Sequence, residues 1–460
     1  MRSTLGVLRV PAFGKLAAAN LVNELGNWLG EIALAVLVFD QTGSAMATAG
    51  LFVAIHFLPA LAAPPLVARL EHLPARSSLS LIYAGEAAVF GSLALLAGDF
   101  LLAAVLVLAA IDGSLASAAR SLTRAAAAGA LKPVGMLREG NAVLNIGFTA
   151  GAAVGPAVAG LVVAGASVQV ALLADAVSFL AVAALLATAR ALPRAQPEVE
   201  GVLARLRSGF AYVSGNPLLR RLLSAQAIAF VFFAIVIPVE VIFAKETLGA
   251  GDAGYGALLA SWGVGMVLGS LAFAGLARAS IPALLALSTM AIGVAYVGTA
   301  AAPTLALACA ASVIGGIGNG VQWVALMTAV QAVTASAYQA RVVAMLEAIA
   351  SAMPGLGFLV GGAVATLADP RAAFAVAGAG VLVVLLGAVV LLRNTDWGDA
   401  DAEDAPRTGE PTVAPTPAGG GSRGAVSQQT QAELPESAQI WAAMSSCSDG
   451  EPFCGRPWPP

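Results

Sequence analysis

Twelve apolar runs, each long enough to cross a lipid bilayer, dominate the first 393 residues of the chain. They lie at 15–39, 48–70, 77–97, 101–119, 139–165, 168–189, 222–245, 254–277, 281–301, 304–328, 343–367 and 371–392. About 20 helical residues span a hydrocarbon core of about 30 Å. Charged residues make up only 11% of the chain, against about 25% in soluble domains. The sequence therefore predicts an all-α polytopic membrane protein with twelve transmembrane helices, and it excludes soluble enzymes and nucleic-acid-binding proteins.

The lysines and arginines fall almost entirely on one side of the predicted helices. Three of the 23 lie beyond position 393, and of the remaining 20 only Lys245 and Arg371 fall on the opposite side. Cytoplasmic loops of membrane proteins carry an excess of such residues. We therefore expect a multi-pass protein of the bacterial inner membrane with both termini in the cytoplasm.

The longest segment between apolar runs, 190–221, separates an N-terminal six-helix bundle (1–189) from a C-terminal one (222–393). Leu206, Phe210 and Val213 share one face of this segment, and Arg205 and Arg207 accompany them. This pattern predicts an amphipathic helix on the membrane surface, with a plain solvated linker as the alternative. The tail, 394–460, is acidic and rich in Pro and Gly, so we expect it to be disordered.

A weak internal repeat relates the two bundles. A shift of 206 residues superposes Gly151 on Gly357 and Gly155 on Gly361. Such repeats are typical of transporters whose halves are related by an axis along the membrane normal, with the substrate bound between them near the midplane.

Polar side chains form a stripe along the first run. Spacings of 3, 1, 3 and 4 residues place them on one helix face: Asn20, Asn23, Glu24, Asn27 and Glu31. An ionised carboxylate at the bilayer centre costs about 2.5 to 3.5 kcal/mol. The stripe therefore either lines a water-filled cavity or bonds to neighbouring helices. We hypothesise that Glu31 or Glu24 carries a coupled proton or meets a cationic substrate.

The second bundle has fewer charges within its apolar runs. Asn319, Gln322 and Trp323 share one face of the tenth run, and Gln226 lies early in the seventh. Amides and an indole suit hydrogen bonding and stacking with a large amphipathic ligand. Packing in the bundle core is the alternative for each of them.

Several segments resemble the branch of the major facilitator superfamily that contains macrolide-efflux proteins and the enterobactin exporter. They include Glu24-Leu-Gly-Asn-Trp-Leu-Gly-Glu31, Val38-Phe-Asp-Gln-Thr-Gly-Ser44, Asp112-Gly to Arg124, and Ala340-Arg-Val-Val-Ala-Met-Leu-Glu347. The resemblance covers most of 11–393. It implies two six-helix bundles of the major facilitator fold, a small-molecule substrate, and a proton gradient in place of a cofactor or metal.

The resemblance also assigns roles to charged residues within the helices. In the family arrangement the fourth helix lines the cavity, so Asp112 is a third candidate for proton or substrate binding, with pairing to a nearby helix as the alternative. The third and sixth helices lie at the periphery, so we expect Glu86 and Asp175 to make structural bonds.

Gly151, Gly155, Pro156 and Gly160 in the fifth helix are similar to the signature of proton-coupled drug exporters. Proline removes a backbone donor and kinks a helix, while glycines let a neighbouring helix approach closely. A general helix-packing motif is the alternative interpretation.

The loop after the second helix departs from the family pattern. Its sequence is Val67-Ala-Arg-Leu-Glu71-His72-Leu-Pro-Ala-Arg76, in which valine replaces a glycine and histidine an arginine. If the loop gates the inner mouth, Glu71 and Arg76 are its retained charges, and Arg341 and Glu347 resemble a family pair at the inner end of helix 11. An ordinary charged loop and a surface salt bridge are the alternatives.

These features predict a monomeric secondary transporter that exports a small amphipathic compound, such as a drug, antibiotic or siderophore, by proton antiport. The chain has no G-x-x-x-x-G-K-[ST] loop and no H-E-x-x-H motif, which argues against an enzyme. An importer or lipid flippase of the same fold, and a transport-inactive membrane sensor or scaffold, are the alternatives.

Overall fold

The computed structural model describes residues 5–70, 72–189, 192, 202–276, 279–335 and 338–392. In these residues it contains helices, turns and short loops, and no strand. Twelve of its helical segments are long and apolar enough to cross a membrane. The predicted fold class is confirmed. Glu71 and the tail 394–460 lie outside the described residues.

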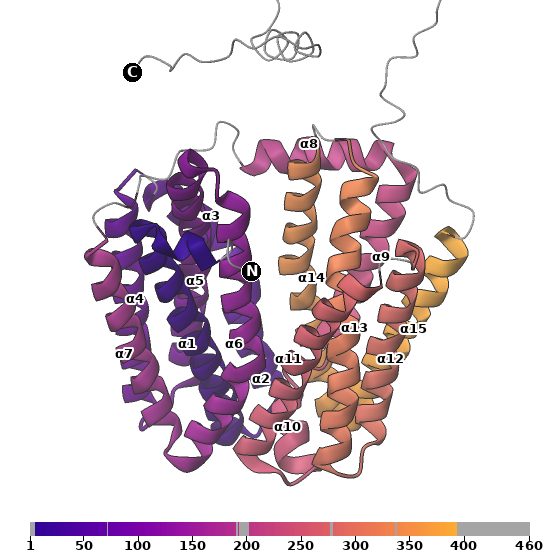
Figure 1. Cartoon of the computed structure of the whole chain (residues 1–460). Coiled ribbons are helices and arrows are strands. Elements are labelled where there is room, and N and C mark those ends of the chain that lie inside the picture. The colour runs from indigo at the N-terminus through magenta and orange to yellow at the C-terminus, as the bar shows by residue number, and fades with distance from the viewer. Residues whose placement is uncertain are drawn as a thin grey trace, which may run out of the picture. The chain divides into compact units, whose positions relative to one another are not determined.

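The first six spans form the N half, drawn from indigo to magenta in Figure 1. They are α1 (Pro11–Thr42), α2 with η2 and α3 (Ala45–Phe52, Val53–Phe57 and Pro59–Leu70), α4 (Ala75–Leu96), α5 (Leu102–Leu131), α6 (Leu137–Gly165) and α7 (Val168–Ala187).

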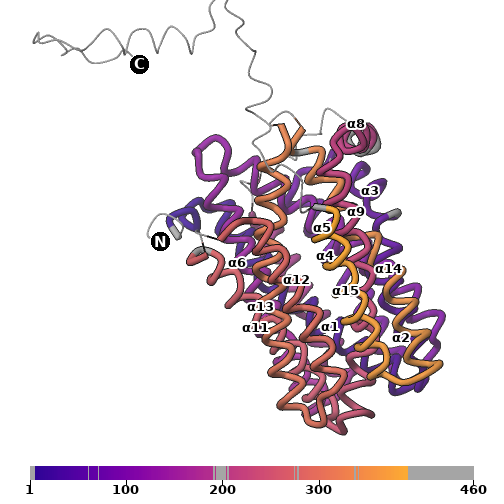
Figure 2. Tube along the Cα trace, turned by 90° about the vertical axis from the view of Figure 1, so that its right-hand side faces the viewer, coloured from indigo at the N-terminus to yellow at the C-terminus, as the bar shows by residue number. Residues whose placement is uncertain are grey.

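The helix α8 (Val202–Gly215) leads into the C half. The six spans of the C half are α9 (Pro217–Ala234) with the short turns α10 (Glu240–Ile242) and η4 (Phe243–Thr247), α11 (Gly251–Gly275), α12 (Ile281–Ala301), α13 (Leu305–Ala332), α14 (Gln339–Leu367) and α15 (Pro370–Leu392). Figures 1 and 2 show α8 at one end of the spans, and Figure 1 shows α10 at the opposite end. These are called the α8 end and the α10 end below.

Local sequence signals explain where several helices begin and end. α1 starts at Pro11, and it ends where Gly43 adopts a left-handed conformation with φ 57°. Asn216 caps α9, since its side chain accepts hydrogen bonds from the N–H groups of Leu218 and Leu219, both at 3.1 Å. Ser44 caps α2 in the same way, by accepting the N–H of Ala47 at 3.2 Å.

Two predicted boundaries were wrong. α5 continues to Leu131, although the apolar run ends at 119, because an alanine-rich segment extends the helix beyond Arg120 and Arg124. The run predicted at 222–245 instead begins at Pro217, where Asn216 caps it, and is interrupted after Ala234. Pro238 lies in this interruption and cannot donate a backbone hydrogen bond.

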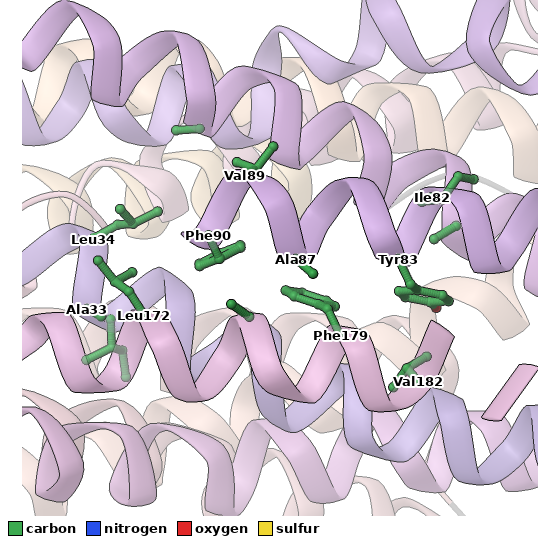
Figure 3. Packing of buried hydrophobic residues seen from close by; sticks show 14 of the residues in the cluster. Ala33, Leu34, Ile82, Tyr83, Ala87, Val89, Phe90, Leu172, Phe179 and Val182 are labelled. Atoms are coloured by element: carbon green, nitrogen blue, oxygen red, sulfur yellow. The ribbon is translucent and has the colours of Figure 1, made fainter. Parts of the chain in front are cut away.

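The interior of the N half is packed with apolar and aromatic side chains. Figure 3 shows Tyr83 and Phe90 of α4 facing Phe179 of α7, and the centroids of the Phe90 and Phe179 rings lie 5.4 Å apart. In lipid, close packing rather than the hydrophobic effect holds helices together. This packing fixes α4 and α7 against each other, and Leu34 of α1 belongs to the same cluster.

The helix α8 lies where the amphipathic helix is predicted, and it packs on α14. A Cβ atom at Gly209 would lie 2.9 Å from the carbonyl oxygen of Arg341. The rings of Tyr212 and Tyr338 are stacked with centroids 4.2 Å apart, and the hydroxyl of Tyr212 accepts the N–H of Ala335 at 3.1 Å. The connection between the halves is thereby attached to the C half.

Candidate functional site

The two halves touch mainly through two helix pairs, α6 with α11 and α2 with α14. In the first pair, a Cβ at Gly160 would lie 2.8 Å from the Cα of Gly256, so the two backbones are in contact. Gly263 lies equally close to the backbone of Ala152. Because glycine has no side chain, these positions let the helices approach closely.

The second pair is close at its α10 end. A Cβ at Gly362 of α14 would lie 2.7 Å from the Cβ of Ala49 in α2. Further along, Gly355 accommodates the ring of Phe57, which a Cβ would approach to 2.7 Å. Each of the two helix pairs between the halves therefore contains close contacts made by glycines. In both pairs these contacts extend to the α10 end.

An ion-paired triad joins the halves at the α10 end. Lys245 of η4 donates hydrogen bonds to Asp40 at the end of α1 and to Asp252 at the start of α11, each at 2.6 Å. The Lys245 side chain is only 18% exposed. Burial lowers the pKa of Lys245, but the hydrogen bonds and charges of Asp252 and Asp40 outweigh it and raise the pKa overall. The triad thus keeps its cation at physiological pH.

A second pair of titratable side chains lies on the part of the N half that is beside the C half. His56 of η2 lies 3.6 Å, Nε2 to Oε1, from Glu31 of α1. Their side chains are 37% and 25% exposed, so the space beside the pair is open. The His56 ring stacks on Phe52 with centroids 6.0 Å apart. It also lies 5.9 Å from the ring of Phe358, which belongs to α14 of the C half.

Three more polar groups act electrostatically on this pair. Glu240 of α10 interacts with Glu31, and Tyr255 of α11 interacts with both glutamates. Asp112 of α5 interacts with Glu31 and His56. Carboxylates from both halves, an imidazole and aromatic rings are therefore gathered at the interface. Such a set can hold and release protons, and it can attract an organic cation.

The π-helical turn η2 explains the position of His56. A π turn is wider than an α turn, and such turns occur frequently at functional sites. In η2 the N–H of Leu58 donates to the carbonyl oxygen of Val53 at 3.1 Å, five residues back. The extra residue changes the direction in which the following side chains leave the helix.

The polar stripe of α1 divides between two environments. Asn20, Glu24 and Trp28 face glycines of α6. A Cβ at Gly147 would lie 3.1 Å from Asn20 Nδ2, and one at Gly151 would lie 3.0 Å from the Glu24 Cβ. A Cβ at Gly155 would lie 2.8 Å from the Trp28 Cβ. Asn23 is buried, and its Oδ1 has no hydrogen-bond partner. Asn27 and Glu31 are partly exposed.

The fifth-helix motif lies on two interfaces. Gly151 and Gly155 of α6 receive α1 within the N half, while Gly160 receives α11 of the C half. The carbonyl of Pro156 closely approaches Gly256 of α11. These contacts give every residue of the motif a packing role.

Three of the predicted C-half residues come together. Gln226, Asn319 and Gln322 line one small pocket with Phe230 and Phe233. Gln322 donates to the hydroxyl oxygen of Thr289 at 2.8 Å. Trp323 does not line this pocket, and its side chain is exposed.

At the α8 end the two halves are joined by an exposed ion pair. Arg124 of α5 lies 3.5 Å from Glu347 of α14, and their side chains are 68% and 53% exposed. Arg341 instead lies over the ring of Tyr338, with its guanidinium carbon 5.5 Å from the centroid. Arg76 is exposed. Of the charges expected at the inner gate, Glu347 contacts the other half, and its partner Arg124 was not expected. Glu71 lies outside the described residues.

A large recess lies elsewhere, between α2–α3 and α5. Its volume is about 710 Å³, and its lining is apolar except for Ser114 and Arg69. Neither Glu31 nor His56 lines it. Its composition suits lipid chains rather than a polar ligand, so the charged pair at the interface is the better candidate site.

Sequence reasoning did not single out His56 or the Lys245 triad. His56 is one of only two histidines and lies inside an apolar run, which is a usable signal. For the triad, the signal is the presence of Asp40, Lys245 and Asp252 at neighbouring run ends on the same predicted side.

Comparison with known proteins supports a transporter. A family model described as a transmembrane secretion effector (MFS_3) matches residues 2–426. The structure of the nucleoside transporter NupG has a TM-score of 0.68 and 14% identity, covering 83% of this chain and 99% of that one. A POT family transporter in complex with a thioalcohol-conjugated peptide has a TM-score of 0.66 and 11% identity, covering 83% and 96%.

A third structure is a bacterial homolog of the human lysosomal transporter Spinster, with a TM-score of 0.60 and 15% identity, covering 83% of this chain and 95% of that one. No curated protein matches the chain. At these identities the solved structures show a shared fold alone, whereas the family model covers most of the sequence. The chain therefore belongs to the transmembrane secretion effector family of the major facilitator superfamily, a family of membrane transporters and not of enzymes.

Proposed function

We propose that the protein exports a small amphipathic compound across the bacterial inner membrane in exchange for protons, by alternating access between its two halves. The observation that carries this proposal is the Glu31–His56 pair, which is partly exposed and lies beside Phe358 of the other half. A proton or a cationic ligand bound there changes the charge at the interface between the halves. It can therefore change the relative stability of two arrangements of the halves.

The distribution of charges supports an orientation. By the order of the spans in the sequence, all but two of the lysines and arginines that precede position 394 fall on the side of α8, which favours a cytoplasmic location for this side and for both termini. With the α10 end closed by the triad and the glycine contacts, the structure then corresponds to a state closed toward the outside.

Two observations support export of an amphipathic compound. The matching family is described as a secretion effector, and segments such as Val38-Phe-Asp-Gln-Thr-Gly-Ser44 resemble macrolide-efflux proteins and the enterobactin exporter. Aromatic rings at the interface, Phe52 and Phe358, and the amide pocket of Gln226 and Asn319 offer stacking and hydrogen bonding to such a molecule.

The test is proton-driven movement of fluorescent probes into proteoliposomes that contain the full chain. Ethidium serves as the amphipathic cation and a fluorescein derivative as the anion. We expect Glu31→Gln to abolish the response of transport to the proton gradient, and Asp99→Asn, a change in an exposed loop between α4 and α5, to leave it intact. Proton-driven transport of both probes by Glu31→Gln at the unsubstituted rate would overturn the proposal.

A further inference from the structure

Two carboxyl groups lie deep in the N half, away from the interface with the C half. Glu86 of α4 and Asp175 of α7 are fully buried. Neither Glu86 oxygen has a hydrogen-bond partner, and Oδ2 of Asp175 has none either. The other oxygen, Oδ1, accepts the hydroxyl of Ser178 at 3.0 Å. The structural bonds expected for Glu86 are therefore absent from the part of the chain that the structure describes.

The surroundings of these two groups are apolar. Figure 3 shows the parts of α4 and α7 that carry them, with Ala87 and Phe90 on one side and Leu172 and Phe179 on the other. An ionised carboxylate without a counter-ion or a donor is very costly in such surroundings. A carboxyl that served packing alone would be replaced by an apolar side chain without that cost, so its presence needs another explanation.

Glycines of α1 make room for Asp175. A Cβ at Gly30 would lie 2.5 Å from Asp175 Oδ2, and the carboxylate also lies directly against Gly26. Any other residue at these positions would displace the carboxyl group. The pocket for Asp175 is thus built by the same helix that carries Glu31.

Asp112 connects the buried groups with the interface. Glu86 interacts electrostatically with Asp112 and Asp175, and Asp175 also interacts with Asp112. Asp112 in turn interacts with Glu31 and His56, and its Oδ1 has no hydrogen-bond partner. The helix that carries Asp112, α5, packs against α4, which carries Glu86, and against η2, which carries His56.

Few other charges face the buried groups. Arg120 of α5 is the cation that acts on both Glu86 and Asp112, but it is exposed and donates to the hydroxyl oxygen of Ser117 at 3.1 Å. Tyr83 of α4 interacts electrostatically with Glu86 and with Glu24 of α1. Among the described residues, no group of three metal-ligating side chains could hold a metal ion. A proton needs no such set of ligands, because a single carboxyl oxygen binds it.

We propose that Glu86 and Asp175 form a buried proton store, which exchanges protons with the Glu31–His56 pair through Asp112. Each step breaks an O–H bond on one carboxyl group and forms one on the next, so the donor becomes a carboxylate as the acceptor becomes neutral. The inference rests on the proposed proton coupling and extends it. Protons taken up at the interface are then held inside the N half while the halves rearrange.

Infrared spectroscopy of the full chain in lipid vesicles tests the store without any substrate. Protonated carboxyl groups give a carbonyl stretch that shifts on exchange into D₂O. We expect this band at neutral pH in the unsubstituted protein, and its partial loss in Glu86→Gln and in Asp175→Asn. Asp99→Asn, which changes an exposed carboxylate, should leave the band unchanged. A band unaffected by both buried substitutions would overturn the proposal.

Two further variants test the relay through Asp112 and show whether a lost band could result from misfolding. Asp112→Asn should keep the band but slow its response to a jump in pH, because it removes the intermediate carboxyl group. Gly30→Ala should shift the band without removing it, since both carboxyl groups remain while Asp175 is displaced. An unchanged response rate in Asp112→Asn would overturn the relay. If the band behaves as expected while Glu31→Gln keeps full proton-driven transport, the store stands and the proposed function fails.

Discussion

The two ends of the interface between the halves are held together in different ways. At the α10 end, glycines such as Gly160 and Gly256 bring backbones into contact, and the part-buried Lys245 joins both halves. At the α8 end, the contacts that the described residues show include an exposed ion pair, Arg124 with Glu347. Exposed pairs contribute about 0–1 kcal/mol. The stability of this arrangement of the halves should therefore depend on the α10 end.

The largest effect is expected from filling the glycine contact. Gly263→Leu would force a side chain into the backbone of Ala152 on the other half, and overpacking of this kind costs about 1–3 kcal/mol. We expect the α10 end to open. Spin labels at Met46 and Leu367, two exposed positions on opposite halves, would report a longer distance in a background without the native cysteines.

The matched control is Gly275→Leu on the same helix, because a Cβ there meets no atom within 4 Å. If Gly263→Leu left the distance between the labels unchanged, the glycine contact would not determine closure.

Removing the shared cation should have the next largest effect. Lys245→Gln loses one hydrogen bond across the halves, to Asp40, and one within the C half, to Asp252. A bond to a charged group is worth about 1.5–3 kcal/mol, and the bond to Asp40 lies toward the lower end because the Asp40 side chain is 44% exposed. We expect at least about a tenfold shift toward the open α10 end in the populations of label distances. Arg371→Gln is the control, because Arg371 bonds only within the C half, to the carbonyl oxygens of Ala300 and Ala302 at 2.6 and 2.8 Å. A similar opening in both variants would contradict the assignment.

The triad also predicts a response to alkaline pH. The pKa of Lys245 is raised above 10.5 when the triad forms, so its contribution to closure is complete below 10.5 and is lost as pH rises through the raised value. We expect the distance between the labels at Met46 and Leu367 to stay constant as the pH rises from neutral to 10.5. Opening that begins well below this pH would contradict the raised pKa of Lys245, and a similar pH response in Lys245→Gln would show that another group controls closure.

The smallest effect is expected at the α8 end. Arg124→Gln removes the exposed pair with Glu347 and should change the balance of states by less than about 1 kcal/mol. Raising the salt concentration should reduce even this difference, because exposed charges are screened. An effect as large as that of Lys245→Gln, measured with the same labels, would reverse the ranking of the two ends.

The sequence predicted the spans well because their lengths and apolar character follow directly from the bilayer. It was less successful where helices extend past the membrane or break within it. The alanine-rich extension of α5 to Leu131 has no apolar signal of its own, and the interruption between Ala234 and Glu240 depends on tertiary packing around Pro238.

The site was predicted less completely than the fold. The polar stripe of α1 was visible from spacing, but spacing cannot show that Glu24 faces Gly151 while Glu31 meets His56. The π-helical turn that carries His56 lies within an apolar run, and the apolar pattern does not distinguish it from an α-helix. Pairings such as Lys245 with Asp40 join residues from different halves, and a single sequence contains no information on which run ends become neighbours.

The attachment of α8 to α14 has a mechanical consequence. With Gly209 on the Arg341 backbone and Tyr212 stacked on Tyr338, the connecting helix should travel with the C half as one rigid piece. A ligand or antibody fragment that binds α8 would then restrain the movement of α14. Because α14 carries Glu347, such binding would also affect the ion pair with Arg124 at the α8 end, although the bound molecule stays outside the membrane.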